Sequence, residues 1–145
     1  MKLRIEPASA DVLAQRAAWR YPPPYDFYDD DGAPPKNPER FYGVYDESGA
    51  VVEFFYFEGR GDAILFGLGL RPELTGQGLG DEFVSAGIAF AERTFGKRRI
   101  VLDVAAFNEQ AIKVYERAGF RRTRSRMRSF QRFGEVPFVD MERPA

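Results

Sequence analysis

A glycine-rich segment, LRPELTGQGLGDEF at positions 70–83, constrains the fold more than any other part of the chain. The apolar run before it, 62–70, is typical of a buried strand, and a second such run follows at 98–106. Between them, residues 78–96 repeat apolar side chains at helical spacing and end at Gly96. A strand, a helix and a strand in this order predict two parallel strands joined by a helical crossover.

The other segments add antiparallel strands and two more helices. Two helices are indicated at 9–19, capped by Ser9, and at 108–120, capped by Asn108 and ended by Gly119. Strands are expected at 2–6, 40–46, 50–58, about 121–131 and 136–142, and the proline-rich stretch 21–39 as a long loop. The expected fold class is therefore α/β with a mixed (α+β) sheet, an antiparallel meander plus a parallel strand–helix–strand unit. We expect a single domain over 1–145.

The chain contains no cysteine and no histidine, which limits its chemistry. Disulfides and a cysteine nucleophile are excluded, and so is a Ser-His-Asp triad. The commonest metal ligands are missing, so we expect no metal site. Any proton transfer must use Asp, Glu, Tyr, Lys or water.

The sequence also gives expectations about location. No apolar run approaches the ~20 residues that a membrane helix needs. The start, MKLRIEPASAD, lacks the apolar region of a signal peptide. We therefore expect a cytoplasmic protein that does not bind membranes. A net charge of −1 gives no general attraction to nucleic acid, so we expect no nucleic-acid partner either.

The core of the glycine-rich segment is TGQGLG, residues 75–80. Small residues at the start of a helix can leave backbone N–H groups open to an anion, aided by the helix dipole. Taken alone, the segment fits a plain tight turn equally well. It lacks the Lys-Ser/Thr pair of a P-loop, and its spacing differs from the dinucleotide-binding fingerprint. Asp81 and Glu82 follow in the first helical turn, and we expect them to point sideways to solvent.

The second segment of interest is NEQAIKVYERAGF, 108–120, in which Asn108 and Tyr115 share one helix face. By itself this pattern is typical of a tyrosine packed in the core. Together, the two segments resemble the GNAT superfamily of acetyl-CoA-dependent N-acyltransferases. The family's phosphate-binding motif, Arg/Gln-x-x-Gly-x-Gly/Ala, falls on Thr75, Gly78 and Gly80, with Thr75 departing from the usual Arg or Gln. The family's Asn-x-x-Ala-x-x-x-Tyr-x-x-x-Gly-Phe segment matches Asn108, Ala111, Tyr115, Gly119 and Phe120.

The resemblance implies a GNAT-type acyl-CoA N-acyltransferase fold that uses acetyl-CoA as co-substrate. It implies direct transfer of the acetyl group to the amine of a small acceptor, in a ternary complex. Backbone N–H groups of the strand before the loop would stabilise the oxyanion of the thioester carbonyl. Tyr115 would protonate the leaving thiolate, because a reference pKa of about 10 keeps a tyrosine protonated at neutral pH. The cofactor-binding residues would be Leu68, Gly69, Leu70, Thr75, Gly76, Gln77, Gly78, Leu79, Gly80 and Asn108.

Two acids are candidates for the general base that deprotonates the amine. Glu53 lies in the apolar run AVVEFF, where burial could raise its pKa, or it simply faces solvent on a half-buried strand. Asp103 lies in IVLDVAA and could serve as base or in the acceptor site, or it is a satisfied structural carboxylate. A water relay to either acid is an alternative.

The proline-rich loop would contribute to the acceptor site. Its aromatic residues Tyr21, Tyr25, Phe27 and Tyr28 are interleaved with Asp26, Asp29, Asp30 and Asp31. Aromatic faces and carboxylates attract a cationic amine. A solvated loop whose aromatic rings tuck into the core explains the same pattern.

Arginines alternate near the end of the chain. The alternate positions, which share one face of a strand, are Arg122, Arg124, Arg126, Arg128 and Arg132. This face is either solvated or binds the 3′-phosphate of coenzyme A or an acidic partner.

Other classes of function stay open. A domain that binds acyl-CoA without turnover, as a sensor or scaffold, explains the two motifs as well. A nucleic-acid-binding module would rest on the arginine segment alone. The sequence does not name the acceptor, and it leaves a homodimer open.

Overall fold

The computed structural model describes residues 2–30 and 33–145. Its α-helices are α1 (Ala10–Ala18), α2 (Gly80–Phe95) and α3 (Glu109–Arg117), with short 3-10 turns η1 (Tyr25–Tyr28), η2 (Pro38–Arg40) and η3 (Pro72–Leu74). Its strands are β1 (Arg4–Pro7), β2 (Phe41–Tyr45), β3 (Val51–Arg60), β4 (Ala63–Leu70), β5 (Arg99–Ala105), β6 (Arg121–Phe130) and β7 (Gly134–Arg143). Hydrogen bonds link the strands in the order β1-β2-β3-β4-β5-β7-β6, which is a mixed sheet.

The chain divides into two compact units, and both β3 and β4 contribute residues to each. The first unit comprises Met1–Phe57 and Gly67–Leu79, and the second comprises Glu58–Phe66 and Gly80–Ala145.

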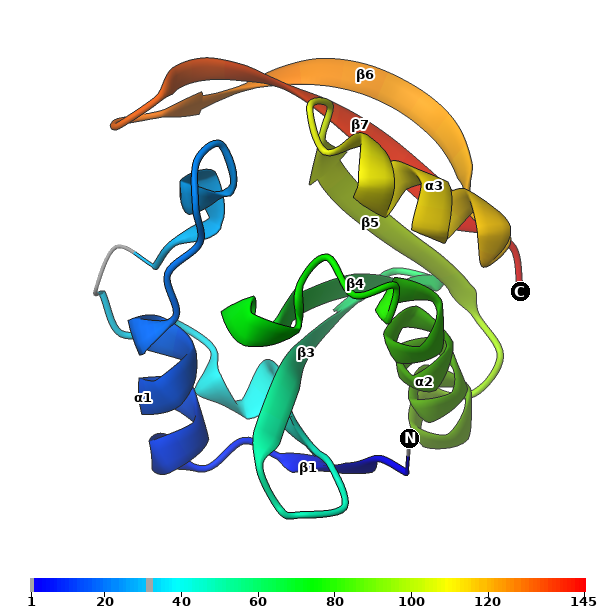
Figure 1. Ribbon diagram of the computed structural model, residues 1–145. Helices are drawn as coiled ribbons and strands as arrows, with labels where there is room; N and C mark the ends of the chain where they lie inside the picture. Colours follow the sequence, from blue (N-terminus) through cyan, green and yellow to red (C-terminus); the bar gives the residue numbers. More distant parts are fainter. Residues whose placement is uncertain (1, 31–32) are drawn as a thin grey trace. The chain divides into compact units, whose positions relative to one another are not determined.

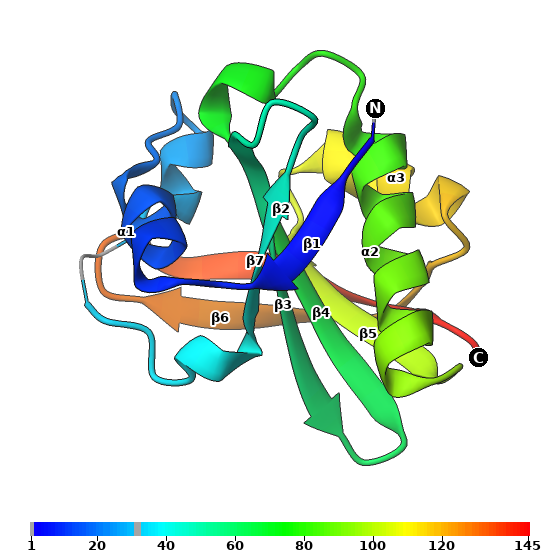
Figure 2. The same cartoon turned by 90° about the horizontal axis from the view of Figure 1, so that it is seen from below.

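The first unit is an antiparallel meander with one helix. β1 pairs with β2, and β2 pairs with β3, so that these three strands lie side by side (Figure 2). The side chain of Ser9 caps α1 by accepting from the Val12 N–H at 3.2 Å. α1 packs closely on β2, because a Cβ on Gly43 would lie 3.1 Å from the Val12 side chain. The core of this unit includes Val12, Val44 and Phe55.

The second unit contains the strand–helix–strand crossover. β4 runs parallel to β5 over Ala63–Leu65, and β5 continues through antiparallel β7 to β6 (Figure 1). Alternate β5 side chains, Ile100, Leu102 and Val104, are buried, as are Phe83, Val84, Ile88 and Ala91 of α2. The other side chains of β5 lie on the opposite face of the sheet. The expected fold class and the parallel pair are therefore confirmed.

Two sequence predictions need correction. The arginine segment contains a register shift between Arg122 and Arg124, which is a β-bulge at Thr123. Arg122 is consequently opposite buried Met141 and pairs with Glu116 of α3, whereas Arg121 joins the face that carries Arg124. Arg132 lies beyond the end of β6 at Phe130.

The second correction concerns the proline-rich loop, which contains η1 and most of η2, so Arg40 belongs to a 3-10 turn and not to the strand. Asp31 lies outside the described residues. None of the helices described over 2–30 and 33–145 has the length and apolar character that a membrane crossing requires.

Candidate active site

The glycine loop 75–79, in the first unit, has the backbone of an exposed anion-binding turn. Gly76 and Gly78 adopt φ of +74° and +73°, a region that other residues rarely enter. A Cβ at either position would have no heavy atom within 4 Å, so open space surrounds the backbone there. The side chains of Thr75 and Gln77 brace the loop by donating to the carbonyls of Pro72 and Glu73, both at 2.7 Å. Thr75 therefore shapes this loop instead of extending a charged side chain from it.

The helix that follows the loop begins in the second unit with Gly80 and an acidic turn. A Cβ on Gly80 would lie 3.0 Å from Val114 of α3, so glycine at this position lets α2 and α3 pack closely. Asp81 accepts two hydrogen bonds from Arg117, at 3.0 and 3.1 Å. This pairing offsets the Asp81 charge, which would otherwise oppose an anion at the start of α2.

Asn108 and Tyr115 both lie on α3, as the sequence predicts. The Asn108 side chain accepts from the Ala111 N–H at 3.3 Å, which makes it the helix N-cap. The half-buried Tyr115 ring meets Phe120 edge-on, with ring centroids 5.8 Å apart. This contact fixes the side of α3 on which Tyr115 lies.

Glu53, in the first unit, is fully buried, with 0 % of its surface exposed. It lies on β3 opposite Val44, and within the described residues neither carboxylate oxygen has a hydrogen-bond partner. Burial raises the pKa of this carboxyl well above its ordinary value of 4.5. The solvent-facing interpretation of Glu53 is therefore wrong.

Asp103, in the second unit, is held by two arginines of β6. One of its oxygens accepts from Arg126 at 2.8 Å and from Arg128 at 3.0 Å. The sequence left open whether Asp103 is a base, part of the acceptor site or a structural carboxylate. This geometry favours a structural carboxylate whose hydrogen bonds are made within the protein.

The contacts around the end of β4 in the first unit could not be predicted from the sequence. The Tyr21 hydroxyl donates to the Leu70 carbonyl at 2.7 Å. Burial, with a smaller contribution from the nearby Asp29 carboxylate, raises the Tyr21 pKa to about 12. Gly69 leaves room for the Phe54 ring, since a Cβ would lie 2.7 Å from its Cζ atom. Leu68, Gly69 and Leu70 are all half-buried.

Two arginines of the first unit, Arg16 and Arg71, also have buried side-chain nitrogens. The Arg16 guanidinium lies 4.6 Å and 5.1 Å from the ring centroids of Phe41 and Phe54. In the described part of the chain, the buried Nε atoms of Arg16 and Arg71 lack hydrogen-bond partners. The sequence places Tyr21 among the aromatic residues of the proline-rich loop, but it does not specify a contact 49 residues away.

The aromatic residues of the proline-rich loop lie in η1. Tyr25 is half-buried, and Tyr28 is 41 % exposed with its ring edge-on to Phe27. The side chain of Asp29 accepts from the Tyr21 N–H at 2.9 Å, which closes the loop on itself. Asp29 is thus partly used within the loop, and its assignment to an acceptor stays a prediction.

The sequence matches the profile of the acetyltransferase (GNAT) family over residues 8–120, which is most of the chain. This chain belongs to the GNAT acetyltransferase family.

A curated relative is a mycothiol acetyltransferase of Propionibacterium freudenreichii, 36 % identical over 80 residues. The match spans 52 % of this chain and only 25 % of that protein, so the chain corresponds to a quarter of its relative.

Solved structures agree on the GNAT fold. A chimeric spermidine N-acetyltransferase from Vibrio cholerae and hSSAT has a TM-score of 0.77 at 17 % identity, covering 99 % of this chain and 96 % of that one. A phosphinothricin acetyltransferase from Sinorhizobium meliloti, solved with AcCoA, has a TM-score of 0.72 at 18 % identity, covering 99 % and 89 %. At these identities the similarity supports the fold alone.

Proposed function

We propose that this chain is an N-acetyltransferase that moves an acetyl group from acetyl-CoA directly to the amine of a small acceptor. Family membership supports acetyl transfer in general. The observation that supports catalysis, as opposed to binding alone, is the fully buried carboxyl of Glu53, which has no hydrogen-bond partner among the described residues. Burying such a group costs stability, and perturbed ionisable residues of this kind concentrate at functional sites.

The glycine loop fits the pyrophosphate of acetyl-CoA. Its two left-handed glycines and the open space around them let backbone N–H groups approach an anion. Because Thr75 replaces the usual Arg or Gln, we propose that binding relies on the amides of residues 76–80. Leu68, Gly69 and Leu70 would present backbone groups to the pantetheine and the thioester carbonyl. Asn108 would assist by setting the start of α3, which it caps.

Proton transfer in the proposed reaction uses two residues. Glu53, in its ionised form, accepts the proton that the acceptor amine loses as its nitrogen bonds to the acetyl carbon. The carbon–sulfur bond of the thioester breaks, and the leaving thiolate takes the hydroxyl proton of Tyr115. A base with a raised pKa suits this role, because proton transfer is most effective when the pKa approaches the working pH. Asp103 is not required as a base, since two arginines already hold it.

Two measurements on the full chain test the proposal. Acetyl-CoA should raise the thermal midpoint of unfolding, because a ligand that binds only the native state stabilises it. The unmodified chain should release free thiol from acetyl-CoA with at least one amine of a panel. The Tyr25→Ala and Tyr28→Ala variants, assayed in the same way, test the acceptor loop. Stabilisation without thiol release from any amine would favour the sensor. The absence of both effects would contradict both coenzyme A interpretations.

The Tyr115→Phe variant tests the acid separately. We expect turnover to fall by about 100-fold, as for loss of a general acid, with the acetyl-CoA-induced thermal shift retained. Unchanged turnover would remove Tyr115 from the mechanism.

A further inference from the structure

The second unit carries a charged surface that the proposed acetyl transfer does not use. Five arginines, Arg60, Arg99, Arg124, Arg126 and Arg128, line a cleft of about 630 Å³, and we call them the arginine face. Three carboxylates, Asp103, Asp140 and Glu142, line the same cleft. The residues come from β3, β5, β6 and β7, on the side of the sheet opposite the buried β5 side chains.

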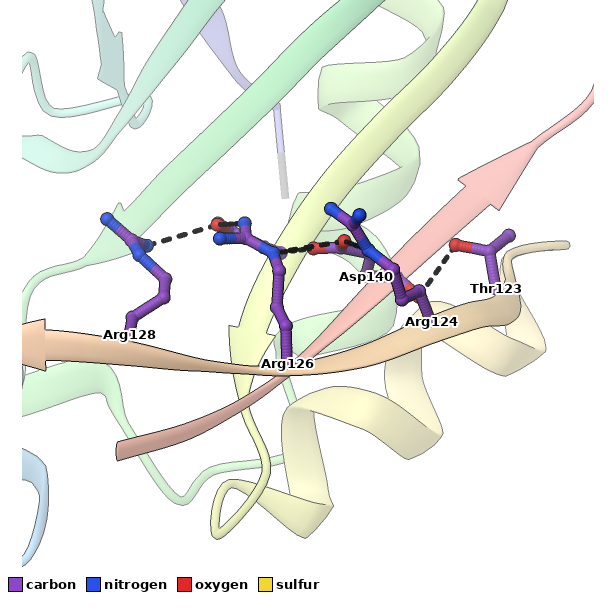
Figure 3. A network of polar contacts seen from close by, with 6 residues as sticks. Thr123, Arg124, Arg126, Arg128 and Asp140 are labelled. Carbon is purple, nitrogen blue, oxygen red and sulfur yellow. Dashed lines mark hydrogen bonds and ion pairs between the residues drawn. The ribbon is translucent and has the colours of Figure 1, made fainter. Parts of the chain in front are cut away.

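The strand β6 arranges three of these arginines in a row. After the bulge at Thr123, Arg124, Arg126 and Arg128 alternate along the strand and so point to one face. Figure 3 shows them side by side, with Asp140 between Arg124 and Arg126. Asp140 accepts from both of these arginines at 3.1 Å, and Asp103 links Arg126 to Arg128. The carboxylates of the protein therefore hold the arginines in fixed positions.

The carboxylates do not use the full capacity of the arginines. Arg60 and Arg99 have further acidic partners, Glu58 and Asp62. In the row on β6, however, three guanidinium groups share only Asp103 and Asp140, which leaves one positive charge in excess. Each guanidinium has five N–H donors and each carboxylate about four acceptor positions, so the donors of this row outnumber its acceptors roughly twofold. The Arg124 side chain remains 69 % exposed, whereas Arg126, which bridges both acids, is 35 % exposed.

We propose that the arginine face binds a small anion that carries two or more carboxylate groups. The excess charge attracts an anion and repels a simple cationic amine. The planar guanidinium fork matches a carboxylate in a bidentate manner. Alternate residues of a strand lie about 7 Å apart, so a short di- or tricarboxylate can contact neighbouring arginines. The cleft volume is that of a small-molecule site, which favours such a ligand over a macromolecule.

The test is calorimetric titration of citrate into the full chain without acetyl-CoA, at constant ionic strength. We expect saturable binding to the unmodified chain. The double variant Arg124→Gln with Arg128→Gln should bind citrate at least about tenfold more weakly, since it loses two charge-assisted contacts. The matched control is Arg122→Gln, which removes a charge from the same strand on the other face, where Arg122 pairs with Glu116. It should keep its affinity within about twofold, because long-range charge effects are screened by salt.

Three outcomes would overturn the proposal: no citrate binding to the unmodified chain, unchanged affinity in the double variant, or an equal loss in Arg122→Gln. If the double variant does not fold, as judged by circular dichroism, Arg124→Lys replaces it. This change keeps the charge but loses the fork, so weaker citrate binding supports the proposal and unchanged binding contradicts it.

The carboxylates can belong to the acceptor itself or to a separate ligand, and a second arm distinguishes these sources. Thiol release from acetyl-CoA is compared for L-glutamate and n-propylamine, in the unmodified chain and the double variant. Glutamate-dependent release that the double variant loses assigns the carboxylates to the acceptor. Citrate binding without glutamate-dependent release assigns them to a separate anion. Only this arm depends on the proposed acetyl transfer, so failure of the transferase proposal leaves the citrate titration valid.

Discussion

Glu53 on β3 and Asp103 on β5 are both acids within apolar strand sequences, but the structure treats them differently. Glu53 is fully buried, and within the described residues its carboxylate has no hydrogen-bond partner. Asp103 is partly exposed and accepts hydrogen bonds from two arginines. Two similar sequence patterns therefore give one carboxyl that burial drives toward the neutral form and one that accepts hydrogen bonds from two arginines.

The difference shows what makes an acid useful as a base. Desolvation without a partner raises the pKa of Glu53, because the charged form loses its hydration and gains nothing in return. One Asp103 oxygen is instead already occupied by hydrogen bonds from two arginines. We therefore propose Glu53 as the base and a role for Asp103 in positioning the arginines.

The largest expected effect is on the rate of acetyl transfer when each acid is replaced by its isosteric amide. Glu53→Gln should lower kcat/KM for acetyl transfer by about 100-fold or more, the usual range for loss of a general base. Asp103→Asn should lower kcat/KM by no more than about threefold, because ion pairs near the surface contribute little. Free-thiol release with an amine identified from the panel measures both variants. Equal losses in the two variants would contradict the proposed difference between the two acids. A larger loss in Asp103→Asn would indicate that Asp103, and not Glu53, is the base.

The second prediction concerns pH and stability. The folded pKa of Glu53 lies above its ordinary value of 4.5, so the folded state binds the proton more tightly than the unfolded state. Between these two pKa values the unfolded chain holds fewer protons, and the free energy of unfolding therefore falls as pH rises. Urea unfolding of the unmodified chain across this window should show the decline. Glu53→Gln should show a smaller decline, and an identical pH dependence in both proteins would mean that Glu53 is not desolvated.

Much of the framework for this comparison was predictable from the sequence. Apolar periodicity located β4, α2 and β5, and side-chain chemistry located the Ser9 and Asn108 caps. These features depend on local sequence and are therefore encoded within a few residues.

The difference between the two acids was not predictable, because it depends on residues distant in sequence. The burial of Glu53 depends on its pairing opposite Val44, and a continuous apolar run does not tell which face is covered. The partners of Asp103 lie 23 and 25 residues away. Arg126 and Arg128 share a face by strand alternation, but the sequence does not show that this face meets Asp103. The bulge at Thr123, which removes Arg122 from that face, leaves no mark in a simple alternating pattern.

A smaller effect is expected for the stability of the paired acid. Asp103→Asn should reduce the free energy of unfolding by about 1 kcal/mol, the upper end for partly exposed ion pairs. This corresponds to a thermal midpoint lower by roughly 3 °C in a chain of this length. The loss should shrink at high salt, which screens the interaction. Calorimetry at two salt concentrations tests this, and a loss that is independent of salt would show that Asp103 acts through packing.

The smallest expected effect tests whether Glu53 truly lacks a donor. Tyr21 lies close enough for the Glu53 charge to contribute to its raised pKa, but its hydroxyl donates to the Leu70 carbonyl. Tyr21→Phe should lower the free energy of unfolding by about 0.5 kcal/mol, the low end for one lost hydrogen bond. The pH dependence of stability should keep the shape seen in the unmodified chain, because Glu53 loses no partner. Should the decline with pH become steeper in Tyr21→Phe, the hydroxyl stabilises the Glu53 anion, and Glu53 would then resemble Asp103 as an acid held by a specific donor.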